Sequence, residues 1–224
     1  MKLLCSTAFK GIMPFLLEQY NPNAINSFEI TYGTTLGLVE QCMTRLDIDA
    51  VIFTDNGIEH LLKHQKLLKS SVTPITKTGL GIAIAKDSKP VDISSTKSFI
   101  DTLLECDSIA FTQHGASGMY FSRLIQRLNI EHEILQKAIR PEGGLVAKLV
   151  ESNEVQLAVQ LVSEIKAVDG VNLLGLIPEE YQEWSVFSIA KTIDSTSDGI
   201  NHFIEFLKTP KLQKELAPFG FFNL

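Results

Sequence analysis

The chain has 224 residues, of which 45% are hydrophobic and 21% are charged, and its formal net charge is -6. This composition excludes a disordered chain and provides enough apolar surface for one large domain or two small ones. A negative net charge with scattered Lys and Arg residues argues against nucleic acid as a partner, because phosphate backbones are bound by basic surfaces.

Helix-like and strand-like segments alternate in the first half of the chain. Apolar residues at helical spacing predict a helix from Phe9 to Tyr20, which Pro14 should kink. The other elements predicted in this half are a strand over 28–32, a helix after the turn Gly33-Thr34-Thr35, a continuously apolar strand over 50–53 and a helix over 57–68.

The alternation continues to the end of the chain. Its predicted elements are a strand over 79–86, a helix carrying Phe99 and Leu104, a strand over 108–112, a helix striped by Phe121 and Leu128, a helix opened by Gly143-Gly144, strands over 155–160 and 186–190, and closing helices that Pro210 stops.

Strands that alternate with helices predict an α/β fold with mainly parallel sheets that helices flank. No flexible linker marks a domain boundary, so strands would join two lobes. The strand at 79–86 and the strand near Val186 are the candidates for these hinges. They divide the chain into lobe I, residues 1–80 plus 186–224, and an inserted lobe II, residues 81–185.

Four turns after predicted strands are rich in hydroxyl or glycine residues. They are Cys5-Ser6-Thr7, Gly33-Thr34-Thr35, Gly115-Ala116-Ser117-Gly118 and the segment around Gln160. In a doubly wound sheet such turns lie where ligands bind, and the helices that begin there offer amide N–H groups to an anion. The alternative is that these residues are ordinary helix caps, since Ser, Thr and Gly are common there.

The cysteines and histidines form no recognisable metal motif. His60 and His64 are four residues apart, but the pair lacks the glutamate of HExxH, and lysines nearby predict a solvated helix face. The cysteines lack zinc-ligand spacing and are expected to be small apolar fillers at Cys5, Cys42 and Cys106. We therefore expect no metal and no cofactor.

Several motifs in fixed order resemble the molybdate-binding-like group of the type II periplasmic solute-binding proteins. The resemblance covers nearly the whole chain and rests on STAFKGIMPFL, ITYGTTLGLVEQ, IDAVIFT, GIAIAKDSKPVDISSTKSFIDTLL, SIAFTQHGASGMYFSRLIQRLNI, EVQLAVQLVSEI and HFIEFLKTPKLQKELAPFGF. It implies a two-lobed fold that closes about two hinge strands on a small anion. The implied ligand-binding residues are Ser6, Thr7, Thr34, Thr35, Ser117, Gly118 and Gln160.

Three functions stay open at this point. The first is a monomeric binding protein that captures a molybdate-like oxyanion or an organic acid for the permease of an ABC transporter. The second is an isomerase of a small polycarboxylate, because this subgroup also resembles aconitate isomerase. For that reaction His114, beside the Gly115 turn, is the candidate base. The third is a ligand-sensing regulatory domain.

The amino terminus shows no export signal, because Lys2 is followed by only two leucines before a polar segment. We therefore expect the chain in the periplasm if a signal has been removed from it, and in the cytoplasm otherwise.

Overall fold

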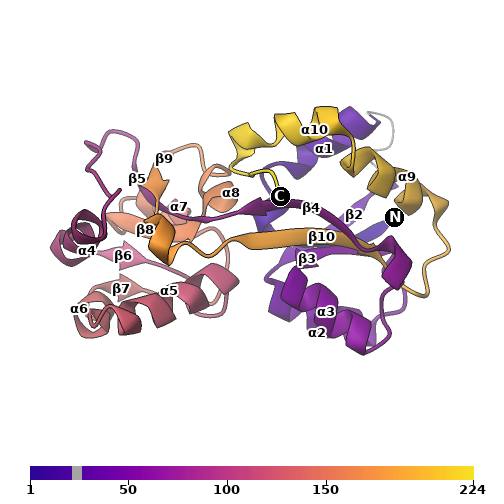
Figure 1. Ribbon diagram of the computed structural model, residues 1–224, viewed down its shortest axis with the longest axis horizontal. Coiled ribbons are helices and arrows are strands. Elements are labelled where there is room, and N and C mark those ends of the chain that lie inside the picture. The colour runs from indigo at the N-terminus through magenta and orange to yellow at the C-terminus, as the bar shows by residue number, and fades with distance from the viewer. Residues whose placement is uncertain (22–26) are drawn as a thin grey trace. The chain divides into compact units, whose positions relative to one another are not determined.

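The computed structural model describes residues 1–21 and 27–224. The chain divides into two compact units, of which unit 1 comprises Met1–Lys77 and Ser185–Leu224 and unit 2 comprises Thr78–Trp184. Each unit contains a five-stranded sheet flanked by helices (Figure 1). The predicted class, α/β with two lobes, is thereby confirmed.

The sheet of unit 1 is built around a central strand, β3, whose first four residues are buried. Its strands, in spatial order, are β2 (Glu29–Gly33), β1 (Lys2–Ser6), β3 (Ala50–Thr54), β10 (Ser185–Lys191) and β4 (Thr73–Thr78). Helices cover both faces, which explains the continuous apolar run in β3. One face carries α2 (Thr35–Thr44) and α3 (Asp55–Lys63), and the other carries α1 (Met13–Tyr20), α9 (Asp198–Leu207) and α10 (Pro210–Glu215) (Figure 1).

The sheet of unit 2 repeats this architecture with shorter strands. They are β7 (Ala138–Ile139), β6 (Ile109–Ala110), β8 (Leu157–Leu161), β5 (Leu80–Ala85) and β9 (Val171–Leu176), in spatial order. The helices on one face are α5 (Ala116–Arg127) and α6 (Glu131–Leu135), with α4 (Thr96–Glu105) packed on α6. The helices on the other face are α7 (Ala147–Glu151) and α8 (Val162–Ile165).

Both sheets are mixed, with parallel strands in one part of each sheet and antiparallel strands in the other. In unit 1, β1 is parallel to β2 and β3, whereas β10 runs antiparallel to β3. In unit 2, β6 is parallel to β7 and β8, whereas β5 runs antiparallel to both β8 and β9. The antiparallel strands follow the two passages of the chain between units, where no crossover helix is needed to reverse direction.

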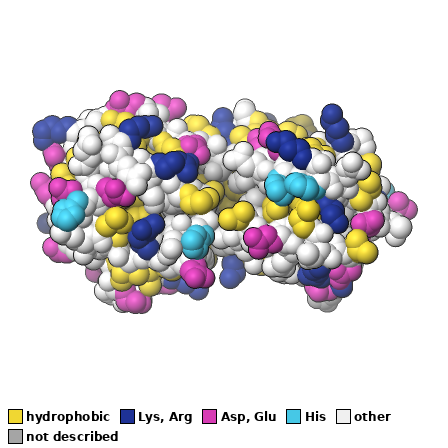
Figure 2. Space-filling view, turned by 90° about the horizontal axis from the view of Figure 1, so that it is seen from below, with side chains coloured by type: hydrophobic (Ala, Val, Ile, Leu, Met, Phe, Trp, Pro, Cys, Tyr) yellow, Lys and Arg dark blue, Asp and Glu magenta, His cyan; other side chains and the backbone are white. Residues whose placement is uncertain are grey.

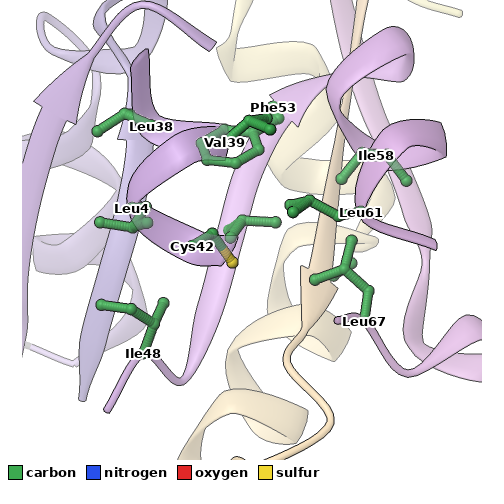
Figure 3. Close-up of a cluster of buried hydrophobic side chains, with 11 residues drawn as sticks. Leu4, Leu38, Val39, Cys42, Ile48, Phe53, Ile58, Leu61 and Leu67 are labelled. Atoms are coloured by element: carbon green, nitrogen blue, oxygen red, sulfur yellow. The ribbon is translucent and has the colours of Figure 1, made fainter. Parts of the chain in front are cut away.

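Each unit has its own apolar core. In unit 1, side chains of α2 and α3 pack on the sheet to form the cluster in Figure 3, which includes Leu4, Val39, Phe53, Ile58 and Leu61. In unit 2, α7 and α8 cover the sheet through a second cluster that includes Ala110, Ala147, Val150, Ala158 and Ile165. Burying a Leu, Ile or Phe side chain contributes roughly 1.5–3 kcal/mol, so these clusters fix the sheets and with them the turns at their edges.

Two predictions about proline were wrong. The helix expected from Phe9 is a short 3-10 turn over Thr7–Phe9 followed by α1, which begins at Met13 with Pro14 in its first turn and no kink from proline. Pro210 does not stop a helix but begins α10, since α9 already ends at Leu207. The physical reason is the same, because proline lacks only an N–H that the first turn of a helix does not use.

Several elements of the fold are absent from the sequence-based prediction or begin elsewhere. The absent elements are the strands β4, β7 and β9 and the helix α6. The helix expected to open at Gly143-Gly144 is α7, which begins at Ala147. The missed strands are polar, very short or irregular in burial, so their pairing depends on neighbours that are distant in sequence.

Candidate functional site

The parallel strands of unit 1 end at one edge of the sheet. Ser6 at the end of β1 pairs with Gly33 at the end of β2, and Cys5 pairs with Ile52 of β3. We call the turns that follow these three strands the unit 1 edge. The edge brings together the Ser6-Thr7 turn and the Thr34-Thr35 turn, as expected for parallel strands.

Two hydroxyls of the unit 1 edge act as helix caps. The Oγ of Ser6 accepts a hydrogen bond from the Ala8 N–H at 3.4 Å, and the Oγ1 of Thr34 accepts one from the Gly37 N–H at 3.3 Å. Ser6 and Thr34 are therefore helix N-caps, as the alternative interpretation of these turns expected. A hydroxyl that accepts a capping bond still has its own O–H to donate, so capping and ligand binding are compatible.

Thr35 is the first residue of α2, and its side chain packs on the neighbouring helix. A Cβ added to Gly57 of α3 would collide with the Cγ2 of Thr35. The methyl group of Thr35 is thus held against α3, and this contact restricts its hydroxyl. Thr7 is half-buried in the 3-10 turn that follows Ser6.

The unit 1 edge also carries a negative charge that the sequence analysis did not single out. Asp55 begins α3 directly after β3, and its Oδ1 accepts a hydrogen bond from the Ser188 Oγ at 3.3 Å. Ser188 is buried, whereas Asp55 is exposed. This part of the edge therefore suits a hydroxyl group or another hydrogen-bond donor better than a second anionic group.

In unit 2 the parallel strands β6 and β8 also end at one edge, with Ala110 paired to Ala158. We call the turn 111–115, the start of α5 and the segment 161–164 the unit 2 edge. Thr112 lies tightly under the first turn of α5, where a Cβ on Gly118 would collide with the Thr112 carbonyl oxygen. Gly118 is thus required for the close approach of this turn to the helix.

The amino end of α5 has no side-chain cap. Its N-cap residue is Gly115, and no side chain accepts a hydrogen bond from the first turn, although α5 is 12 residues long. By contrast, α4 is closed by a capping box in which Ser95 and Ser98 bond each other's backbone N–H. The predicted residue Ser117 is buried in the open turn of α5. The first amide groups of α5 and its dipole together favour an anion here.

Buried polar atoms without a hydrogen-bond partner gather at the unit 2 edge. In the part of the chain that the structure describes, there are three, the Oγ1 of Thr112, the Oγ of Ser163 and the Nε of Arg140. Thr112 and Ser163 are only 3% and 2% exposed. Leaving such a group unsatisfied costs about 1–3 kcal/mol, so each of the three calls for an explanation, and a ligand that contacts them is one. Of the three, Thr112 was not singled out from the sequence.

The predicted ligand residue Gln160 has a different set of contacts. Its side chain is fully buried, its Nε2 donates to the Gly144 carbonyl oxygen at 2.7 Å, and its Oε1 accepts from the Ala147 N–H at 3.2 Å. Both ends of the amide therefore hold the segment that leads into α7. Through these bonds Gln160 fixes the segment 144–147 next to the end of β8.

Next to it, Glu164 is a buried carboxyl group that the sequence analysis did not recognise. It is 8% exposed and follows Ser163 in α8. Burial raises the pKa of Glu164 to about 8, although hydrogen bonds from the Leu161 backbone and the Gln160 side chain lower it in part. The strands that α8 packs on, β5, β8 and β9, contain no ionisable side chain. The carboxyl group is therefore mostly protonated near neutral pH.

His114 belongs to the unit 2 edge, whereas the three cysteines are buried apolar side chains. His114 is exposed in the turn before α5. All three cysteines are buried and unpaired, and burial raises the pKa of Cys42 to about 11, so these thiols are poor nucleophiles. Among residues 1–21 and 27–224, no group of three His, Cys, Asp or Glu side chains is arranged to hold a metal ion.

Surface charge does not gather on the face drawn in Figure 2. Lys and Arg side chains alternate there with Asp and Glu side chains. None of the helices in the described part of the chain has the length and apolar character that crossing a bilayer requires. The face drawn in Figure 2 therefore offers an anion no basic patch.

The chain is similar to known proteins along nearly its whole length. The sequence model for "Bacterial extracellular solute-binding protein" matches residues 1–222. An aconitate isomerase from Pseudomonas sp. is 29% identical over 174 residues, which cover 77% of this chain and 66% of that enzyme, slightly less than two thirds of its length.

Solved structures show the fold. The periplasmic molybdate-binding protein of Azotobacter vinelandii is 16% identical and superposes with a TM-score of 0.80, covering 100% of this chain and 99% of the other. Peb3 from Campylobacter jejuni is 11% identical and superposes with a TM-score of 0.71, covering 100% of both chains.

Proposed function

The chain belongs to the bacterial extracellular solute-binding protein family, and from this premise we propose that it captures a small anion. The proposal has it act as a monomer in the periplasm and deliver the anion to the permease of an ABC transporter. The observation that carries the proposal is the group of unpartnered buried polar atoms at the unit 2 edge, beside the uncapped start of α5.

An anion satisfies what this edge lacks. Thr112 and Ser163 each have a hydroxyl hydrogen to donate, the first turn of α5 has free amide N–H groups, and an anion offers lone pairs to all of them. The proposal assigns Ser117 and Gly118 to this turn of α5. The hydroxyls of Ser6, Thr7, Thr34 and Thr35 are proposed as the donors of unit 1.

Thermal unfolding with a panel of anions tests the proposal. Molybdate, tungstate, sulfate, phosphate, citrate and trans-aconitate should be compared with chloride at equal ionic strength. A ligand at 100 times its dissociation constant stabilises the folded state by about 2.7 kcal/mol, which is a readily measured rise in Tm. If no anion of the panel or of a wider anion library raises Tm, the proposal is wrong.

Thr112→Val is expected to change stability and affinity in opposite directions. Valine has nearly the shape of threonine and removes the unpartnered hydroxyl, so the free energy of unfolding without ligand should rise by about 1 kcal/mol. The same change removes a donor to the bound anion and should weaken binding by roughly 1.5–3 kcal/mol. Urea unfolding and calorimetric titration measure the two quantities.

Thr102→Val on α4 is the matched control, because the hydroxyl of Thr102 already donates to the Ser98 carbonyl oxygen at 2.8 Å. This change should lower stability slightly and leave affinity unaltered. Equal effects of the two substitutions on affinity would show that the anion does not contact Thr112.

A second candidate function, an isomerase that shifts a proton along a small polycarboxylate, is favoured by Glu164 and by the aconitate isomerase relative. Such a reaction removes a proton from one carbon and returns a proton to another, so it needs an acid–base group that titrates near neutral pH. The carboxyl of Glu164 meets this requirement, and His114 is the alternative base. The substrate would bind as the anion at the same edge.

Incubation of the protein with trans-aconitate tests this function. Ultraviolet absorbance measures the conversion to the cis isomer. Glu164→Gln should abolish turnover while trans-aconitate still binds, and His114→Ala distinguishes the two candidate bases by the same comparison. If the unaltered protein binds trans-aconitate but does not convert it over hours, the isomerase function is wrong and only the capture function remains.

A further inference from the structure

Arg140 occupies an unusual position at the unit 2 edge. It directly follows β7, and two backbone hydrogen bonds continue the pairing of β6 and β7 past their ends, from Phe111 N–H to the Ile139 carbonyl at 3.2 Å and from Gln113 N–H to the Pro141 carbonyl at 2.7 Å. These bonds place Arg140 alongside Phe111 and Thr112, in the turn that lies under α5.

The guanidinium group of Arg140 is held in a defined orientation. Its Cζ lies 5.1 Å from the centre of the Phe111 ring, and the Phe111 ring meets the Phe121 ring edge-on at 5.0 Å. Its Nη2 lies 3.5 Å from the Oγ of Ser122 on α5, a long contact. A guanidinium over the face of an aromatic ring is attracted by the ring, and its N–H groups remain able to donate hydrogen bonds.

The positive charge of Arg140 has no partner of opposite sign. No carboxylate of residues 1–21 or 27–224 lies within 4.0 Å of it, and its buried Nε has no acceptor. The guanidinium also lies beside Ser122, in the middle of α5. An unpaired positive charge at a partly buried place costs free energy, and a bound anion would relieve that cost.

The other arginines are engaged elsewhere. Arg45 forms an ion pair with Asp47, and the exposed Arg123 and Arg127 lie over the rings of Tyr120 and Tyr181. Arg140 is thus the arginine that lies beside Phe111 of the unit 2 edge, and its buried Nε has no acceptor.

We infer that Arg140 is the charged ligand contact of the unit 2 edge and that the captured anion is an organic carboxylate, an inference that rests on the anion-binding function proposed above. The Nε and the neighbouring Nη of a guanidinium form a planar fork that matches the two oxygens of a carboxylate. Thr112, Ser163 and the start of α5 then donate to the rest of the same small acid.

Calorimetric titration of the full chain with citrate, malate and lactate, and with molybdate, sulfate and phosphate, tests the inference. We expect at least one carboxylate to bind more tightly than the three inorganic anions. Arg140→Gln should weaken the binding of that carboxylate by on the order of 100-fold. Arg140→Lys should recover only a small part of the lost affinity, because an ammonium group lacks the planar fork. Arg123→Gln, which removes an exposed arginine of α5, should leave affinity unchanged.

The outcomes separate this inference from the proposed function. Tight binding of an inorganic anion that Arg140→Gln does not weaken overturns the carboxylate class while anion capture stands. Carboxylate binding that survives Arg140→Gln overturns the role of Arg140. Binding of none of the anions overturns both. A thermal melt of Arg140→Gln serves as the folding control, and removal of the unpaired charge should leave its Tm at or above that of the unaltered chain.

Discussion

Replacing Glu164 by glutamine is expected to raise the free energy of unfolding by about 3 kcal/mol at pH 7. The carboxyl group has a pKa of about 8 in the folded chain because it is buried, against an ordinary value of 4.5. The folded state therefore binds a proton that the unfolded state releases between pH 4.5 and pH 8. Its contribution to stability is complete below pH 4.5 and is lost as the pH rises towards 8. Glutamine keeps the shape and removes this loss.

Urea unfolding at several pH values between 5 and 8 measures the effect. The difference between the two proteins should be within about 1 kcal/mol near pH 5 and should widen by up to about 1.4 kcal/mol per pH unit. Glu179→Gln is the control, because Glu179 is exposed and the substitution should change stability by less than about 0.5 kcal/mol. A constant difference between unaltered chain and Glu164→Gln across this range would show that Glu164 is ionised in the folded state.

Gly118→Ala is expected to destabilise the chain by about 3 kcal/mol or more, because overpacking against rigid backbone cannot be relieved by a rotamer change. An added Cβ would collide with the carbonyl oxygen of Thr112, and it would lie 2.5 Å from the Thr112 Oγ1. The turn must therefore move away from α5, which also displaces one of the proposed donors. Chemical unfolding measures the loss, and a titration with the best anion of the panel should show weaker binding.

Gly37→Ala is the matched change in unit 1. Gly37 is also in a helix, but it is exposed, and its added Cβ would meet only the Thr34 Oγ1 at 3.3 Å. Alanine favours the helix by roughly 0.5–1 kcal/mol, so stability should change by no more than about 1 kcal/mol. If Gly118→Ala is as mild as Gly37→Ala, Thr112 is not held under α5 as described.

The sequence predicted the parts of the fold that depend on local pattern. The apolar run of β3, the amphipathic helices α4 and α5, and the hydroxyl-bearing turns at Ser6, Thr34 and Ser117 are each specified within a few residues. Prolines were misjudged because the same residue breaks a helix interior and begins a helix well, and only packing decides which occurs.

In the candidate site, too, the sequence predicted the features that depend on local pattern and missed those that depend on packing. Sequence order put the Gly115 turn and the Gln160 segment after two strands, and this was enough to predict a ligand edge in unit 2. It did not reveal that the Gln160 amide is bonded to Gly144 and Ala147, or that Thr112, which lies within the motif SIAFTQHGASGMYFSRLIQRLNI but was not singled out there, is buried without a partner. Hydrogen-bond satisfaction depends on which distant segments meet, and a linear pattern does not contain that information.

By itself, then, the sequence determined the alternation of strands and helices and the chemistry of the turns, because periodicity and turn composition act over a few residues. The tertiary structure alone decided which of those polar groups are free to meet a ligand. Arg140 stands beside Phe111 because the two-residue strand β7 pairs with β6, and Glu164 is buried because α8 packs on strands without ionisable side chains. Burial and pairing of this kind arise only when segments far apart in the chain come together, and they set both the charge and the donors of the site.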